Sequence, residues 1–275
     1  MTEPPAVVTL PMYDFPELRT ATSRLLEKIT SNLSDVGWPV RSLFGDFSDH
    51  ASLVSHWLDP NTALSQSCGL PYLEELRDHA QVLGTFLWRG VSERTGRYRS
   101  VLIVRHDDPR TVDDLAGAQP VINNPESLSG WCSLGAGLGD LGYAAVDFPT
   151  AIRSGAHSRS VDMVATGVAD VAAIDGATFR LLERYRPSVL KNVRGISLGP
   201  VIPATPLITR SHTPIDIETV RGAVADAVID DLASDARDVL GIESFVPLRH
   251  ADYLPILELV SKAEAVIPRQ RLSVP

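Results

Sequence analysis

Residues 154–175 read SGAHSRSVDMVATGVADVAAID, and this stretch indicates the fold most clearly. The order of residue types predicts a polar loop, a short helix, a tight turn at Gly167 and a buried strand that ends on Asp175. A histidine, several hydroxyls and a carboxylate therefore gather at one edge of an α/β unit. Such a group of side chains suits the capture of a small anion better than it suits a reaction.

The residues before this stretch repeat the same alternation of strands and helices. We predict strands at residues 6–10, 40–43 and 64–68, each followed by a helix, the second and third of these helices at residues 50–58 and 71–79. The first helix is expected to be capped by Asp14, to hold Pro16 in its first turn and to stop at Gly37. This order implies a mostly parallel sheet that is covered by helices on both faces.

A second series of the same kind runs from about residue 120 to residue 185. It includes a predicted helix at residues 129–141, a strand at residues 144–148 and a helix at residues 177–185. Two extended segments, residues 98–104 and 196–209, flank this series, and two further helical regions follow at residues 217–240 and 253–265.

These two extended segments predict a chain that crosses between two lobes. We expect lobe 1 to comprise residues 1–100 and 197–275, with residues 101–196 inserted as lobe 2. The predicted fold class is α/β, with two lobes, a central ligand cleft and a hinge whose closure traps a ligand.

The composition narrows the range of functions. The formal net charge of −9, from 25 basic and 34 acidic side chains, argues against a nucleic-acid partner. No apolar run approaches the length of about 20 residues that a membrane span needs, so we expect no membrane insertion. The first residues show no basic and apolar leader, which predicts a cytoplasmic location, or a periplasmic one if the chain is a processed form. The two cysteines lack metal-motif spacing, and we expect no metal, no cofactor and no catalytic residues.

The segment Asn123-Asn-Pro-Glu-Ser-Leu-Ser-Gly130 lies between a predicted strand and a predicted helix. Ser129 is a good candidate for the helix N-cap, Gly130 lets a ligand approach the backbone, and Ser127 can add a hydroxyl donor. Free amides and the positive end of the helix dipole make this a candidate anion site. An ordinary capped helix without a ligand is the alternative.

Two further candidates come from the stretch quoted first. His157 and Ser158 open a predicted helix and could donate hydrogen bonds to phosphoryl or carboxyl oxygens, although a loop histidine is often only solvated. Asp175 ends a strand at the carboxyl edge of the sheet, where α/β proteins bind ligands. It could accept from a polar substituent, or it could simply cap the following helix.

The first series of strands offers three weaker candidates. Tyr13 follows the first strand, and Gln66 and Ser67 end another, so that all three lie at carboxyl ends of predicted strands. Tyr13 could stack on a ligand or bond to it, and the other two could make polar contacts.

Several motifs, in this order and spacing, resemble those of the phosphate/phosphite/phosphonate-binding proteins of ABC transporters. They are Pro11-Met-Tyr-Asp, Ser65-Gln-Ser-Cys-Gly-Leu-Pro, Tyr98-Arg-Ser, Asn123-Asn-Pro-Glu-Ser-Leu-Ser-Gly, Gly155-Ala-His-Ser-Arg-Ser and Gly167-Val-Ala-Asp-Val-Ala-Ala-Ile-Asp. The resemblance extends from about residue 6 to residue 260.

This resemblance implies a type II periplasmic-binding-protein fold that closes around one ligand. It implies that Ser127, Ser129 and Gly130 hold phosphonyl oxygens, that His157 and Asp175 face the ligand, and that the loop with Tyr13 does so as well. A permease of an ABC transporter is the implied protein partner.

We therefore expect a solute-binding protein, and not an enzyme, for a small anionic ligand of the phosphonate or phosphate-ester type. One alternative is an enzyme of cofactor biosynthesis on the same fold, in which His157 and Asp175 would do acid–base work. Another is a cytoplasmic ligand sensor, which the absence of a leader would favour.

Overall fold

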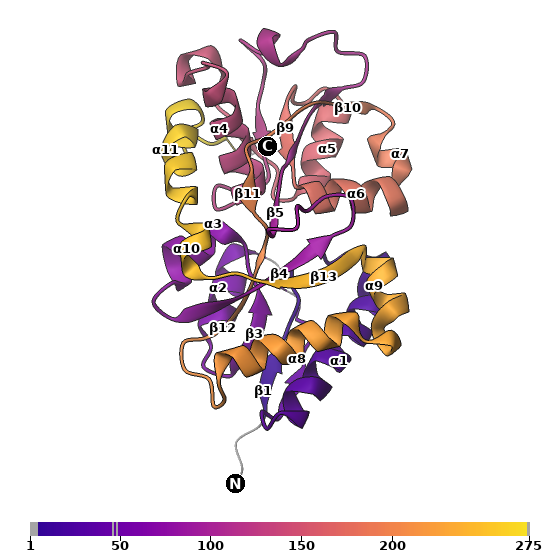
Figure 1. Ribbon diagram of the computed structural model, residues 1–275. Helices are drawn as coiled ribbons and strands as arrows, with labels where there is room; N and C mark the ends of the chain where they lie inside the picture. Colours follow the sequence, from indigo (N-terminus) through magenta and orange to yellow (C-terminus); the bar gives the residue numbers. More distant parts are fainter. Residues whose placement is uncertain (1–4, 46, 48, 274–275) are drawn as a thin grey trace. The chain divides into compact units, whose positions relative to one another are not determined.

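The protein is described by a computed structural model that covers residues 5–45, 47 and 49–273 (Figure 1). The chain forms two compact units. Unit 1 comprises Met1–Arg97 and Pro203–Leu254, and unit 2 comprises Tyr98–Ile202 and Pro255–Pro275. The sequence places residues 255–275 in lobe 1, whereas in the structure they belong to unit 2.

Packing against a glycine-rich helix explains this difference. Helix α11 (Ile256–Val266) packs against α4 (Ser133–Asp140) within unit 2. The two helices approach closely, because a Cβ atom on Gly135 would lie 2.8 Å from the Cα atom of Ala263. In addition, the indole nitrogen of Trp131 donates to the carbonyl of Ile267 at 2.8 Å.

Unit 1 is built on a six-stranded sheet in the order β13-β4-β12-β3-β1-β2. The strands are β1 (Ala6–Val8), β2 (Val40–Ser42), β3 (Thr62–Gln66), β4 (Ala80–Trp88), β12 (Pro206–Arg210) and β13 (Ile242–Pro247). β1 pairs in parallel with β2 and β3, and β12 runs antiparallel to both β3 and β4. β4 is therefore parallel to β1 and β3, and the carboxyl ends of these three strands share one edge. The sheet is mixed, and not mostly parallel as predicted, because β12 and β13 run against β4.

The helices of unit 1 supply its apolar core. They are α1 (Arg19–Asp35), α2 (His50–Leu58), α3 (Gly69–Pro71), α8 (Ile217–Ile229), α9 (Ser234–Leu240) and α10 (His250–Tyr253), with short helical turns at Pro16–Leu18, Tyr72–Leu76 and Asp231–Ala233. α1 packs against α8 and α9 through a buried stripe that includes Leu25, Ile29 and Leu33. This spacing of apolar residues is the helical one that the sequence shows.

Unit 2 contains two small sheets. β10 (Val193–Leu198), β6 (Val101–Arg105) and β9 (Ala172–Ile174) form one, in antiparallel pairs, and β7 (Val121–Ile122) and β8 (Ile152–Arg153) form a parallel pair. A parallel bridge from Pro120 to Val171 connects β7 with the approach to β9. The carboxyl ends of β7, β8 and β9 therefore lie at one edge. β5 (Arg97–Tyr98) and β11 (Ile202–Pro203) lie where the chain passes from one unit to the other.

The remaining helices of unit 2 follow its strands. They are a π-helical turn at Leu128–Cys132 that continues into α4, then α5 (His157–Ala165), α6 (Gly176–Tyr185) and α7 (Pro187–Leu190), with short turns at Val112–Asp114 and Ala145–Asp147. The predicted strand at residues 144–148 is wrong, since a 3-10 turn stands there and Val146 is 92% exposed. The predicted cap by Asp14 is also wrong, because its carboxylate binds the guanidinium of Arg19 at 3.0 Å instead.

Candidate binding site

Three loops meet at the carboxyl edge of β7, β8 and β9 in unit 2. The loop after β7 carries Ser127 and Ser129, the loop after β8 leads to His157, and Asp175 directly follows β9. The predicted convergence of these segments at one edge follows from the parallel direction of the three strands.

Ser127, and not Ser129, caps the helix after β7. The Ser127 hydroxyl accepts the backbone N–H of Gly130 at 2.9 Å, and the helix begins at Leu128. The predicted N-cap is thus shifted by two residues, which places Ser129 in the first turn with its hydroxyl available to another partner. First-turn amides have no acceptor within their own helix, so this helix start offers N–H donors and a positive dipole end.

The other partner of Ser129 is His157, the first residue of α5. The hydroxyl oxygen of Ser129 and Nε2 of His157 are 3.0 Å apart. Two tautomers satisfy this hydrogen bond, but only the one that carries its proton on Nε2 leaves the Ser129 hydroxyl free to donate elsewhere. Two helix N-termini are therefore joined through one short polar contact.

Burial lowers the pKa of His157 below the usual value of 6.5, and this effect exceeds the opposing influences of the Asp175 charge and the backbone carbonyl of Ala173. The imidazole is consequently neutral at pH 7. Nδ1 is buried and makes no hydrogen bond of normal geometry to a described residue. Ser158, next in α5, is partly exposed at the same helix start.

Both carboxylate oxygens of Asp175 accept hydrogen bonds from groups of the protein. One carboxylate oxygen accepts a hydrogen bond from the backbone N–H of Thr178 at 2.8 Å and so caps α6. Capping of this helix is the alternative to ligand binding that the sequence suggested for Asp175. The other oxygen accepts the hydroxyl of Tyr98. The side chain is 3% exposed. Asp175 thereby fixes Tyr98 at this edge of the sheet.

Gly130 meets a requirement of close packing. A Cβ atom at this position would overlap the side-chain oxygen of Asn123 and lie 3.1 Å from the Ser127 hydroxyl. That Asn123 oxygen is buried without a hydrogen bond to a described residue. The Asn123 side chain can therefore pack against the backbone of the helix start only because residue 130 has no side chain.

In unit 1, the carboxyl ends of β1, β3 and β4 carry a second group of polar and aromatic side chains. Thr205, just before β12, lies at the same edge. Its hydroxyl accepts a hydrogen bond from Nε2 of Gln66 at 3.2 Å and lies 3.4 Å from the hydroxyl of Tyr13. Tyr13 and Gln66 are thus brought together, as predicted from their places after β1 and in β3. The Ser67 hydroxyl instead donates to the carbonyl of Cys68 at 3.2 Å and is fully buried.

Sequence reasoning missed two members of this group, Thr205 and Trp88. The ring centroids of Tyr13 and Trp88 are 4.4 Å apart. Trp88 is the last residue of β4, and this place at the carboxyl end of a strand is the signal that could have found it. Thr205 precedes an antiparallel strand, so no rule about carboxyl ends points to it.

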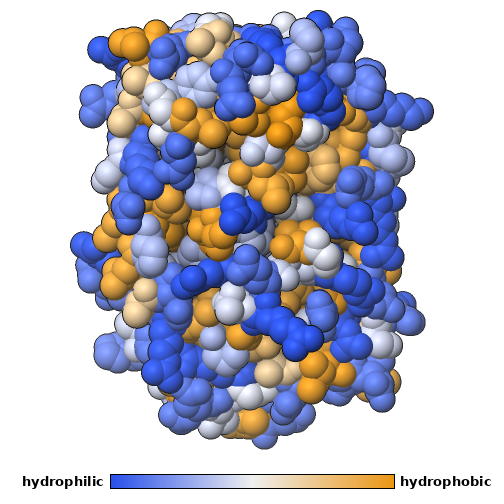
Figure 2. Space-filling view, turned by 45° about the horizontal axis from the view of Figure 1, so that its top comes forward, coloured by the Kyte–Doolittle hydropathy of each residue, from blue (hydrophilic) through white to orange (hydrophobic). Residues whose placement is uncertain are grey.

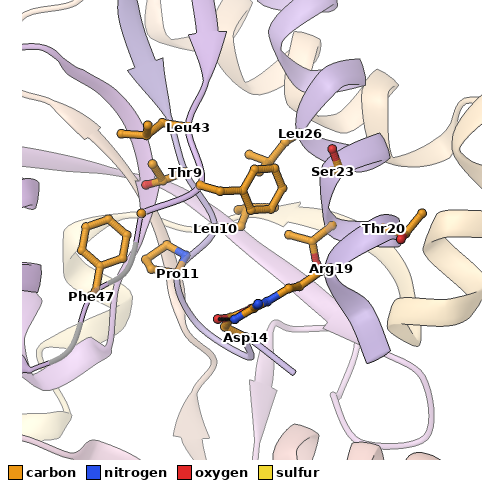
Figure 3. Close-up of a pocket in the computed structure, with 13 residues that line it drawn as sticks. Thr9, Leu10, Pro11, Asp14, Arg19, Thr20, Ser23, Leu26, Leu43 and Phe47 are labelled. Atoms are coloured by element: carbon orange, nitrogen blue, oxygen red, sulfur yellow. Dashed lines mark hydrogen bonds and ion pairs between the residues drawn. The ribbon is translucent and has the colours of Figure 1, made fainter. Parts of the chain in front are cut away.

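A cavity of about 660 Å³ lies beside this group in unit 1 (Figure 3). It is lined by the residues after β1, the start of α1 and the residues after β2, and Figure 3 shows the Asp14 carboxylate against the Arg19 guanidinium on one wall and Phe47 on another. The Asp14–Arg19 pair is more than half exposed on both sides, so it contributes little to stability. None of the predicted binding residues lines this cavity.

The chain belongs to a known family of transport proteins. The family model described as ABC transporter, phosphonate, periplasmic substrate-binding protein matches residues 7–253. This confirms the predicted family and the role of a solute-binding protein. Members of this family are substrate-binding proteins of ABC transporters. No curated protein matches the chain.

Several solved structures have a similar fold. XAC2383 from Xanthomonas citri bound to ATP is 18% identical, covers 97% of this chain and 98% of its own, and gives a TM-score of 0.70. PhnD1 from Prochlorococcus marinus in complex with methylphosphonate is 14% identical over 95% of this chain and 98% of its own, with a TM-score of 0.72. A binding-protein component of an ABC phosphonate transporter from Pseudomonas aeruginosa (PA3383) is 17% identical over 96% and 87%, with a TM-score of 0.75. The fold is that of periplasmic binding proteins, as predicted.

The predicted cytoplasmic location is wrong. The family is one of periplasmic substrate-binding proteins, whereas the prediction rested on the first residues of the sequence, of which residues 1–4 lie outside the described residues. Among the described residues, no helix is both long and apolar enough to cross a membrane. On the face shown in Figure 2, hydrophobic side chains lie interspersed with hydrophilic ones.

Proposed function

We propose that this chain binds a small phosphonate or phosphate ester and delivers it unchanged to an ABC permease. The observation that carries the proposal is the 3.0 Å contact between Ser129 and His157, which joins two helix N-termini at one sheet edge. Helix N-termini bind phosphoryl groups through their free amides and their dipoles. PhnD1 holds methylphosphonate and XAC2383 holds ATP, and both ligands present tetrahedral phosphorus oxyanions.

In this proposal the residues of unit 2 bind the anion. The hydroxyls of Ser127 and Ser129 and the first-turn amides donate to the phosphonyl oxygens, and Gly130 admits them. His157 donates from Nε2 to Ser129 and thereby orients the Ser129 hydroxyl toward the anion. Ser158 adds a donor from the start of α5.

The remaining predicted residues take supporting parts. Asp175 holds Tyr98 and reads a polar substituent of the solute through its remaining lone pairs, since a carboxylate accepts more than two hydrogen bonds. At the edge of unit 1, Tyr13 and Gln66 offer polar contacts to a ligand, and Ser67 shapes that edge through its backbone.

A thermal-shift and calorimetric panel tests the proposal. Methylphosphonate, inorganic phosphate and ATP are the probes, and chloride is the control anion. A binding probe at a concentration of 100 times its Kd adds about 2.7 kcal/mol to the free energy of unfolding. The absence of any stabilisation by the phosphorus oxyanions would contradict the proposal, as would conversion of a bound probe into a product.

A further inference from the structure

A second cavity of unit 1 is lined by none of the candidate binding residues. It has a volume of about 600 Å³ and is lined by the first residues of β4, the turn before that strand, and the starts of α8 and α10. Cavities of about 300–1,000 Å³ are typical of sites for small molecules. Gln81, near the start of β4, lines this cavity, whereas Trp88 ends the same strand beside Tyr13. The length of strand between Gln81 and Trp88 spans about 20 Å, so the cavity is distinct from the edge that carries Tyr13.

Arginine side chains dominate the charge of this cavity. It is lined by Arg77, Arg221, Arg249 and His250, and Asp78 is the only acidic side chain among the described residues that line it. The Asp78 side chain is 83% exposed and lies 4.0 Å from Nε of Arg77, so this pair contributes little. The cavity therefore presents an excess of positive charge, although the chain as a whole carries a net charge of −9.

The guanidinium of Arg221 is held in place by the protein. The residue is 7% exposed, and its Nε and Nη2 donate to the backbone carbonyls of Leu83, Val82 and Leu248 at 2.9, 3.0 and 3.2 Å. Nη1 donates to the carboxylate of Glu218. A guanidinium carries five N–H donors, so these four bonds leave one donor on Nη1 without a partner among the described residues. Because the group is already fixed, it loses little side-chain entropy when it binds an oxyanion.

Tyr72 and His250 add a further donor to the lining. The Tyr72 hydroxyl and Nδ1 of His250 are 3.0 Å apart. When the hydroxyl donates to Nδ1, the neutral imidazole carries its proton on Nε2, and this N–H can donate to a ligand. The polar groups of the cavity are thus mainly donors, which suits a ligand that only accepts.

We propose that this cavity is a ligand site of unit 1, made of residues other than the candidate binding residues. It takes a small polyanion whose phosphate or carboxylate groups bind Arg77, Arg221 and Arg249. The planar fork of a guanidinium fits two oxygens of such a group. One acidic group pairs with the fixed Arg221, and another pairs with the exposed Arg77 or Arg249. This inference does not depend on the proposed function, since all of its residues lie in unit 1.

Isothermal titration calorimetry in the presence of saturating methylphosphonate tests the inference. Pyrophosphate and citrate are the probes, and they distinguish phosphate from carboxylate groups. We expect Arg77→Gln and Arg249→Gln each to weaken binding of the preferred polyanion about tenfold, because each variant removes a charge-assisted hydrogen bond. Both residues are exposed, so the thermal midpoint of the ligand-free protein should hardly change.

Arg24→Gln is the matched control, because Arg24 is exposed on α1, does not line the cavity and carries the same charge. An equal loss of affinity in Arg24→Gln would reduce the effect to net charge and overturn the inference. Absence of binding to either polyanion, or weakening of that binding by Ser129→Ala, would overturn it as well and leave the proposed function intact. Retained polyanion binding without any binding of methylphosphonate would overturn the proposed function alone.

Discussion

The two sheet edges that carry candidate binding residues differ in the kinds of chemical groups that form them. In unit 2 the donors are backbone amides and small hydroxyls at two helix starts, and Ser127, Ser129 and His157 are engaged with one another or with the backbone. In unit 1 the edge consists of long side chains, with Tyr13 against Trp88 and Gln66 on Thr205.

This difference determines how easily each edge can change. Amides and hydroxyls fixed by helix starts hold a geometry that fits one tetrahedral oxyanion, because their positions depend on the backbone. Aromatic and amide side chains can be exchanged by single substitutions without moving a helix. We therefore expect substitutions at the helix starts of unit 2 to disrupt their surroundings more than substitutions at the edge of unit 1.

The largest effect should come from Gly130→Ala. The added methyl group overlaps the side chain of Asn123, and overpacking of this kind costs about 1–3 kcal/mol. If the helix start absorbs that cost by moving, affinity for methylphosphonate falls about ten- to hundredfold. Isothermal titration calorimetry measures the loss.

Gly137→Ala on α4 is the matched control, because a Cβ atom there makes only ordinary contacts, the nearest at 3.6 Å to Pro200. It should leave affinity unchanged and raise helix stability slightly. Equal affinities in the two variants would show that the helix start does not bind the anion.

A smaller effect is expected for Ser129→Ala. The variant removes one donor to the anion and the partner of His157, which together cost about 1–2 kcal/mol, or about five- to thirtyfold in affinity. Ser133→Ala is the control, since the Ser133 hydroxyl donates to the carbonyl of Leu128 at 3.0 Å on the same helix. It should lower the unfolding free energy and spare the affinity, and the comparison fails if Ser133→Ala weakens binding as much as Ser129→Ala.

The smallest effect concerns pH. Burial holds the pKa of both His157 and His56 below the usual 6.5, so the unfolded chain binds more protons than the folded chain as pH falls through that value. The stability from keeping these rings neutral is therefore complete above pH 6.5 and is lost below it. Urea titrations between pH 5 and pH 7 should show a shallower pH dependence in His157→Asn than in the wild type. An unchanged slope would mean that His157 titrates normally in the folded protein.

The sequence predicted the elements whose pattern is local. The helix at residues 50–58 matches α2, and the segment quoted first contains α5, the turn at Gly167 and β9 where they were expected. The sequence predictions failed where the local structure depends on contacts with other residues. Val146 belongs to an apolar run that predicts a strand, yet no neighbouring strand pairs with it. Asp14 had the right chemistry for a cap, but Arg19 lies within reach of its carboxylate.

For the candidate site, the sequence indicated which loops come together better than it indicated the role of each side chain in them. Ser127 and Ser129 are chemically equal as caps, and only the point at which the helix begins assigns one to the backbone and the other to His157. Trp88 and Thr205 were missed because their place at this edge depends on the directions of β4 and β12. It also depends on contacts with Tyr13, which lies in the loop after β1.

The return of residues 255–275 to unit 2 has a consequence for protein engineering. Neither unit is encoded by one continuous piece of sequence, so a clone that ends before Pro255 removes the cover of α4 from the unit that holds Ser129 and His157. Trp131, one turn from the helix start, would also lose its acceptor at Ile267. A shortened C-terminus should therefore behave as a defect of the sheet edge that carries Ser129, although more than a hundred residues separate Ser129 from Pro255 in the chain.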